Sequence, residues 1–188
     1  MKHPHPNRII YYGENRDGVD VVLIADFGKG NGKTSDVIGL AIVPLVTFQA
    51  TKAANHAAIA EGLSAGKASM AAKKAYYYSV RENIEASCGK CPLGAWNSKA
   101  QKAMELSKCY AQHNFQNVAQ AVGMVLRAPD VLPEYGILRV SEFQELRSIA
   151  QYLGIDTVRS TVVGDLGMLP VAIATAFIEA CTGLQWLG

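Results

Sequence analysis

Three cysteines and a histidine in the middle of the chain have the residue types and the spacing of a metal site. Cys88 and Cys91 form a C-x2-C pair, and Cys109 and His113 form a C-x3-H pair further along. Thiolates and imidazoles are the ligands that zinc and softer metals prefer. Four such groups can close a tetrahedral zinc site, or three cysteines can hold an iron–sulfur cluster with one open corner. The spacing leaves open whether His113 is the fourth ligand.

A carboxylate at the end of a predicted strand is a second candidate for chemistry. Asp165 follows Gly164 directly after the apolar run 157–163. In α/β folds, ligands gather at the carboxyl ends of strands. Asp165 can therefore bind a cation or a substrate hydroxyl, or it can simply cap the next turn, and the sequence leaves both readings open.

The glycine-rich segment 28–34 (G-K-G-N-G-K-T) only partly resembles a phosphate-binding loop. Such a loop needs G-x4-G-K-[ST] after a strand and before a helix. Here Phe27 stands at the position of the first glycine, and the residues after Thr34 are predicted to form a strand. Nucleotide hydrolysis is therefore the least favoured of three functions that we consider.

Other reactive or charged residues have simpler explanations. Lys67, Lys74 and Arg81 recur every seven residues beside tyrosines, a pattern that could stack on nucleic acid. Neighbouring glutamates dilute this charge, which favours a solvated helix face. Cys181 lies on the apolar side of a predicted helix, so we expect it to pack in the core.

Composition indicates a folded protein and excludes some classes. Apolar residues make up 49% of the 188 residues and charged residues 18%, with a formal net charge of +2. This charge is too small to argue for a nucleic-acid partner. No apolar run is long enough to span a membrane, and the N-terminus lacks an apolar signal core. We expect a cytoplasmic protein with reduced cysteines.

The apolar patterns predict an α/β fold with a mostly parallel sheet. Ser141 is expected to cap one of the helices, with Gln144 completing a capping box. Alternating strands and helices in the last third imply parallel pairing. Predicted strands are 8–12, 19–27, 37–46, 136–140, 157–163 and 184–187, and predicted helices are 50–61, 67–86, 98–108, 114–127, 141–153 and 170–182.

We expect one domain over residues 1–188, with 47–86 as a helical insertion. The final predicted strand leaves an open sheet edge, which proteins usually cover. We therefore expect a second copy of the chain or another protein to lie against it.

Three short motifs together resemble a family of small uncharacterised bacteriophage proteins. They are G-N-G-K-T at 30–34, the cysteine segment 88–111, and V-R-S-T-V-V-G-D at 158–165. The resemblance implies a partial or degenerate radical-SAM-like barrel. The cysteines do not stand on one short C-x3-C-x2-C loop, so we do not expect radical chemistry.

The same resemblance implies roles for individual residues and a host setting. It makes Cys88, Cys91 and Cys109 the metal ligands, with Asp165 and Lys33 as catalytic residues in the adjacent pocket. Asn31, Thr34 and Gly164 would bind the cofactor. The leading function is a phage-encoded protein of the host cytoplasm that binds zinc or an iron–sulfur cluster. The alternative is a non-catalytic protein with a structural metal that binds and inhibits a host defence or replication factor.

Overall fold

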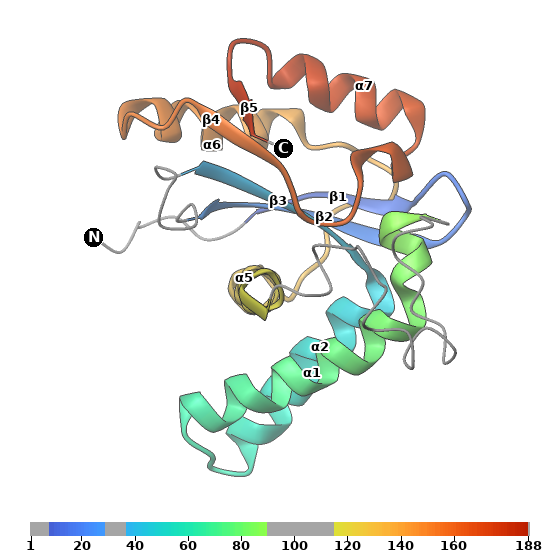
Figure 1. Cartoon of the computed structure of the whole chain (residues 1–188), viewed down its shortest axis with the longest axis vertical. Coiled ribbons are helices and arrows are strands. Elements are labelled where there is room, and N and C mark those ends of the chain that lie inside the picture. Colours follow the sequence, from blue (N-terminus) through green and yellow to red (C-terminus); the bar gives the residue numbers. More distant parts are fainter. Residues whose placement is uncertain (1–7, 29–36, 90–114, 188) are drawn as a thin grey trace.

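The structure of this chain is a computed structural model, and it describes residues 8–28, 37–89 and 115–187. Within these residues the backbone forms one five-stranded sheet, whose strands lie side by side in their order along the chain. Figure 1 shows the sheet in the middle of the molecule, with helices on both sides. The strands are β1 (Arg8–Glu14), β2 (Asp20–Gly28), β3 (Val37–Pro44), β4 (Thr157–Val163) and β5 (Gln185–Leu187).

A tight turn makes the first two strands antiparallel. Parallel neighbours need a crossover of a dozen or more residues, and the short turn between β1 and β2 cannot supply one. The side-chain oxygen of Asn15 accepts hydrogen bonds from the backbone N–H groups of Asp17 and Val19, each at 2.9 Å. This closes the turn on itself. β2 and β3 are also antiparallel, so the first three strands form a meander.

Only the second half of the sheet has the parallel pairing that the sequence pattern predicted. β4 runs parallel to β3, and β5 runs parallel to β4. The sheet is therefore mixed, and the prediction of a mostly parallel sheet was wrong. Strands and helices alternate in the last third of the chain, whereas no helix lies between the first three strands in the residues that the structure describes. β1 and β5 are the two edges, so the described sheet is open rather than closed into a barrel.

Helices cover both faces of the sheet and bury separate hydrophobic clusters. On one face Leu23 and Ala25 of β2 pack with Phe143 and Phe177, whose rings lie 4.7 Å apart. On the other face the alternate side chains of β2 join a second cluster. The first face is covered by α6 (Val140–Tyr152) and α7 (Val171–Ala180), and the second by α1 (Leu45–Ala60), α2 (Ala65–Cys88) and α5 (Phe115–Arg127).

α1 and α2 form a long hairpin that projects away from the sheet (Figure 1). Thr47 Oγ1 and Ser79 Oγ lie 2.9 Å apart where the two helices pack near the sheet. The hairpin covers residues 47–86, and their interpretation as a helical insertion stays a prediction. α1 begins earlier than expected, because the chain turns into a helix directly after Pro44, which is its N-cap.

Residues 136–139 follow the edge of β1 without forming the predicted strand. The backbone N–H groups of Gly136 and Arg139 donate to the carbonyl oxygens of Tyr12 and Ile10, at 2.7 and 2.8 Å. The chain then turns at once into α6. Arg139 is the N-cap of this helix and no side chain caps it, so the predicted capping box at Ser141 was wrong.

The C-terminal elements agree with the sequence pattern. β4 spans the predicted residues, and Pro170 precedes α7 as its N-cap. Cys181 is fully buried in the cluster beside α7, as predicted, and burial raises the pKa of its thiol to about 12. The predicted helix at 98–108 lies outside the described residues. In the described part of the chain, no helix combines the length and apolar character needed to cross a membrane.

Candidate functional site

The C-terminal end of α2 and the C-terminal end of β4 meet at one end of the sheet. The backbone N–H of Asp165 donates a hydrogen bond to the carbonyl oxygen of Ser87 at 2.8 Å. The side-chain amide of Asn15 donates to the carbonyl oxygen of the preceding residue, Ala86, also at 2.8 Å. Cys88 is the last residue of α2 and is half-buried. Because it follows Ser87, its backbone lies close to that of Asp165.

Glycines allow these two segments to approach closely. Gly164 has φ of 94°, and a Cβ atom there would lie 2.8 Å from the Cβ of Ile42. Gly89 has φ of 61°, and its Cβ would lie 2.8 Å from Sδ of Met168. Both positions combine left-handed backbone with a contact too short for a side chain. Gly164 thus has a backbone role, while its predicted cofactor binding stays a prediction.

Asp165 caps the turn that follows β4. Its Oδ1 accepts a hydrogen bond from the backbone N–H of Gly167 at 2.9 Å, and it is the N-cap of the short helix η1 (Leu166–Met168). This is one of the two roles that the sequence left open. The residue is exposed to solvent, so its carboxylate can also reach a ligand at this end of the sheet.

Two buried hydroxyl groups on α2 lie without hydrogen-bond partners among the described residues. They belong to Tyr76 and Ser87, which are 1% and 0% exposed. Burial, and secondarily the nearby Cys88, raises the pKa of Tyr76 well above its usual value. Tyr76 therefore stays protonated, and α2 carries two buried polar groups, the hydroxyls of Tyr76 and Ser87.

Most of the remaining predicted site residues lie outside the described part of the chain. These are Asn31, Lys33, Thr34, Cys91, Cys109 and His113. Among the residues that are described, no group of three or more histidine, cysteine, aspartate or glutamate side chains could hold a metal ion. Of the four proposed metal ligands, Cys88 alone lies within the described residues.

The described residues on either side of the segment with Lys33 lie at the end of the sheet opposite Asp165. These residues, Gly28 and Val37, pair with each other across β2 and β3. β3 then runs from Val37 to Pro44, about 23 Å at 3.3 Å per residue. Midway along β3, Ala41 pairs with Val163, two residues before Asp165. A shared pocket for Lys33 and Asp165 stays a prediction, because Lys33 lies outside the described residues.

Sequence reasoning missed a pocket of about 370 Å³ near the start of β1. Three arginines from distant parts of the chain line it together with one glutamate and a short apolar wall. Positions so far apart follow no motif or period, so only the fold could reveal the site. The lining residues are Arg8, Ile9, Arg127, Pro129, Val131, Pro133, Arg139 and Glu142.

No protein-family model, curated protein or solved structure matches this chain.

Proposed function

We propose that this chain is a metal-binding protein in which Cys88, Cys91 and Cys109 hold zinc or an iron–sulfur cluster, with His113 as the optional fourth ligand. The observation that carries the proposal is the hydrogen bond from Asp165 N–H to the carbonyl oxygen of Ser87. It fixes the first residue of the C-x2-C pair against the end of a parallel strand, where α/β proteins place their ligands.

The donor set is suited to these metals. Thiolates bind both zinc and iron–sulfur clusters, and the C-x2-C spacing brings two sulfurs to one point. The two residues that precede Cys88 are held by hydrogen bonds, Ala86 by Asn15 and Ser87 by Asp165. A ligand held in place in this way loses little conformational freedom when a metal binds. Asp165, whose backbone N–H bonds to Ser87, and Lys33 are the residues proposed to line the pocket beside the metal.

Metal analysis of protein purified without oxygen tests the proposal. Zinc or iron in stoichiometric amounts is expected, with a brown colour and acid-labile sulfide in the iron case. Protein that contains neither metal, and whose Cys88, Cys91 and Cys109 are all alkylated rapidly, would rule the proposal out.

A second candidate is a bacteriophage protein that binds a host protein and uses the metal only structurally. The projecting α1–α2 hairpin favours it, because large apolar side chains on this hairpin are exposed to solvent. They are Val46, Ile59, Leu63, Met70 and Tyr78. X-ray absorption spectroscopy separates the two candidates. A site closed by three sulfurs and one nitrogen supports a structural metal, and an oxygen ligand in the fourth position supports chemistry there.

A further inference from the structure

The pocket near the start of β1 brings three guanidinium groups together from separate elements. Arg8 begins β1, Arg127 ends α5, and Arg139 is the N-cap of α6. The volume of about 370 Å³ lies within the range of small-molecule sites. Glu142 is the single acidic residue among the described lining, so the lining carries a net positive charge.

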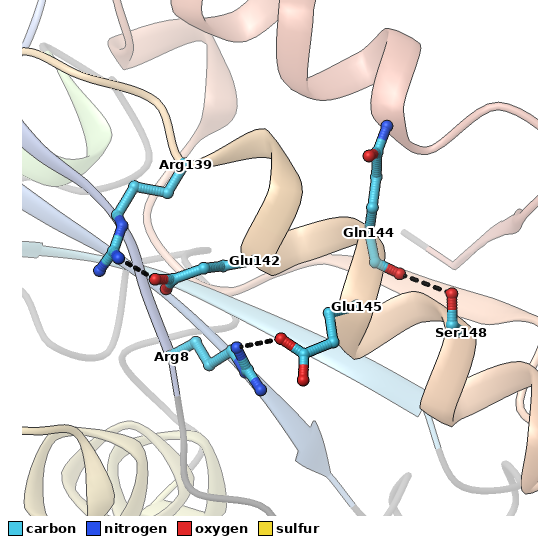
Figure 2. Close-up of polar contacts among 6 residues, drawn as sticks. All are labelled: Arg8, Arg139, Glu142, Gln144, Glu145 and Ser148. Carbon is cyan, nitrogen blue, oxygen red and sulfur yellow. Dashed lines mark hydrogen bonds and ion pairs between the residues drawn. The ribbon is translucent and has the colours of Figure 1, made fainter.

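Each arginine is held by a carboxylate partner. Arg127 Nη2 donates to Oδ2 of the buried Asp26 at 2.5 Å. Figure 2 shows the other two pairs, in which Arg8 reaches Glu145 at 2.9 Å and Arg139 contacts Glu142, one turn apart on α6. The guanidinium groups are therefore positioned before any ligand arrives, which lowers the entropy cost of binding.

These contacts leave donor capacity for a ligand. A guanidinium has five N–H groups, and the contacts between each arginine and its carboxylate use only part of them. Nε of Arg8 is buried and has no hydrogen-bond partner among the described residues. A buried donor without a partner costs free energy, and none of the described contacts of Arg8 satisfies this N–H.

The amino end of α6 adds to the attraction for anions. Arg139 and Glu142, from the N-cap and first turn of this thirteen-residue helix, line the pocket. No side chain caps the helix there, and the unbonded N–H groups of a first turn carry partial positive charge. Phosphate groups bind readily at such helix ends.

The remaining lining residues are apolar. They are Ile9, Pro129, Val131 and Pro133; Val131 is 82% exposed, whereas Ile9 is 2% exposed and packs in the core. An organic group attached to an anion can bury apolar surface against these residues, whereas a bare anion cannot.

We propose that this pocket binds a phosphorylated small molecule. The phosphoryl group lies against Arg8, Arg127 and Arg139 at the amino end of α6, and the organic group lies against the apolar residues. This site is separate from the proposed metal site. Arg8 starts β1 and pairs with Ala25, near the end of β2. Both residues lie at the end of the sheet opposite Asp165.

Titration calorimetry with inorganic phosphate and adenosine monophosphate tests the proposal. The nucleotide should bind more tightly than phosphate, and phosphate should compete with it. The variant Arg139→Gln should weaken both by at least about tenfold, the loss expected for a charge-assisted hydrogen bond. The matched control Arg16→Gln changes an exposed arginine outside the pocket and should bind like the unchanged chain.

A second variant tests the apolar wall. Val131→Asp should weaken nucleotide binding more than phosphate binding, and folding should tolerate it because Val131 is so exposed. Equal affinities for the nucleotide and phosphate, with no effect of Val131→Asp, would overturn the assignment to an organic phosphate. Absence of binding, or binding that Arg139→Gln leaves unchanged, would mean that the arginines serve only as structural ion pairs. Metal content measured on the same variants should not change, which keeps this test independent of the metal proposal.

Discussion

Arg127 Nη2 and Asp26 Oδ2 lie 2.5 Å apart, and this ion pair ties the last residue of α5 to the buried interior of β2. The side chain of Asp26 is 8% exposed, whereas that of Arg127 is 57% exposed. The pair is thus asymmetric, with a buried acid held by a guanidinium that is partly in water. It also fixes one of the three arginines of the phosphate pocket.

Removing the guanidinium should be the more costly change to this pair. Arg127→Ala leaves a buried carboxylate without its ion-pair partner and should destabilise the fold by about 1–3 kcal/mol, as measured by urea unfolding. Adding Asp26→Asn should restore part of this loss, since the uncompensated charge is then gone. Arg16→Ala, which breaks only an exposed contact with Asp17, should change stability by less than about 0.5 kcal/mol. Strict additivity of the two pair mutations would contradict the assigned coupling.

A buried lysine holds the other side of the α5 terminus. Lys52 Nζ donates to the carbonyl oxygens of Leu126, at 3.3 Å, and Ala128, and it pairs with Oδ1 of Asp130 at 3.0 Å. Lys52→Met should cost about 2–3 kcal/mol, because it removes charge-assisted bonds and strands these acceptors. Lys67→Met, on an exposed position of α2, should cost almost nothing. A similar loss in both variants would show that Lys52 acts only through general charge.

The same lysine predicts a pH effect. Its hydrogen bond, together with the charges of Lys52 and His56, holds the pKa of Asp130 below its usual value of 3.8. The resulting stabilisation is present above that usual value and is lost as the pH falls through the lower pKa of the folded state. In an NMR titration, Lys52→Met should move the pKa of Asp130 back toward 3.8. An unchanged pKa would argue against the hydrogen bond.

Gly164 and Gly62 separate backbone strain from packing. Both have positive φ, of 94° and 75°, but a Cβ on Gly62 would meet nothing within 4 Å. Gly62→Ala should therefore cost about 1 kcal/mol from strain alone. Gly164→Ala should cost about 2–4 kcal/mol, since it adds the clash with Ile42. Equal losses in thermal unfolding would mean that the segments near Asp165 are not closely packed.

The buried hydroxyl of Tyr76 offers a test with the opposite sign. Because it has no hydrogen-bond partner among the described residues, Tyr76→Phe should leave stability unchanged or raise it by up to about 1 kcal/mol. Val80→Ala, which opens a cavity on the same helix, should instead destabilise the protein. A loss on Tyr76→Phe would reveal a partner for the hydroxyl.

Local patterns predicted most elements of the fold, while pairing depended on connections. β4 and the helix after Pro170 follow directly from apolar runs bounded by glycine and proline. The mixed character of the sheet comes from the Asn15 turn, whose hydrogen bonds close a hairpin. The run 136–140 was predicted as a strand from its composition, but its amides only border β1 before α6 begins.

The candidate sites differ in how far sequence could reach them. Cys88 and Asp165 were visible because each lies in a local motif, and the fold brings their backbones together. Arg8, Arg127 and Arg139 share no motif, and only the fold places them around one pocket. Arg127 pairs with Asp26, Arg8 pairs with Glu145 on α6, and Arg139 is the N-cap of α6. Long-range pairing of this kind leaves no periodic signal in one sequence.

The most direct test of the metal proposal is the metal content of two matched cysteine variants. Cys88→Ala and Cys181→Ala each leave three thiols, but Cys181 is fully buried in the core beside α7. Both proteins, purified without oxygen, are analysed for zinc, iron and sulfide per folded chain. The account predicts that Cys181→Ala keeps the metal of the unchanged protein and that Cys88→Ala loses it. Equal metal content in the two variants, or none in the unchanged chain, would contradict it.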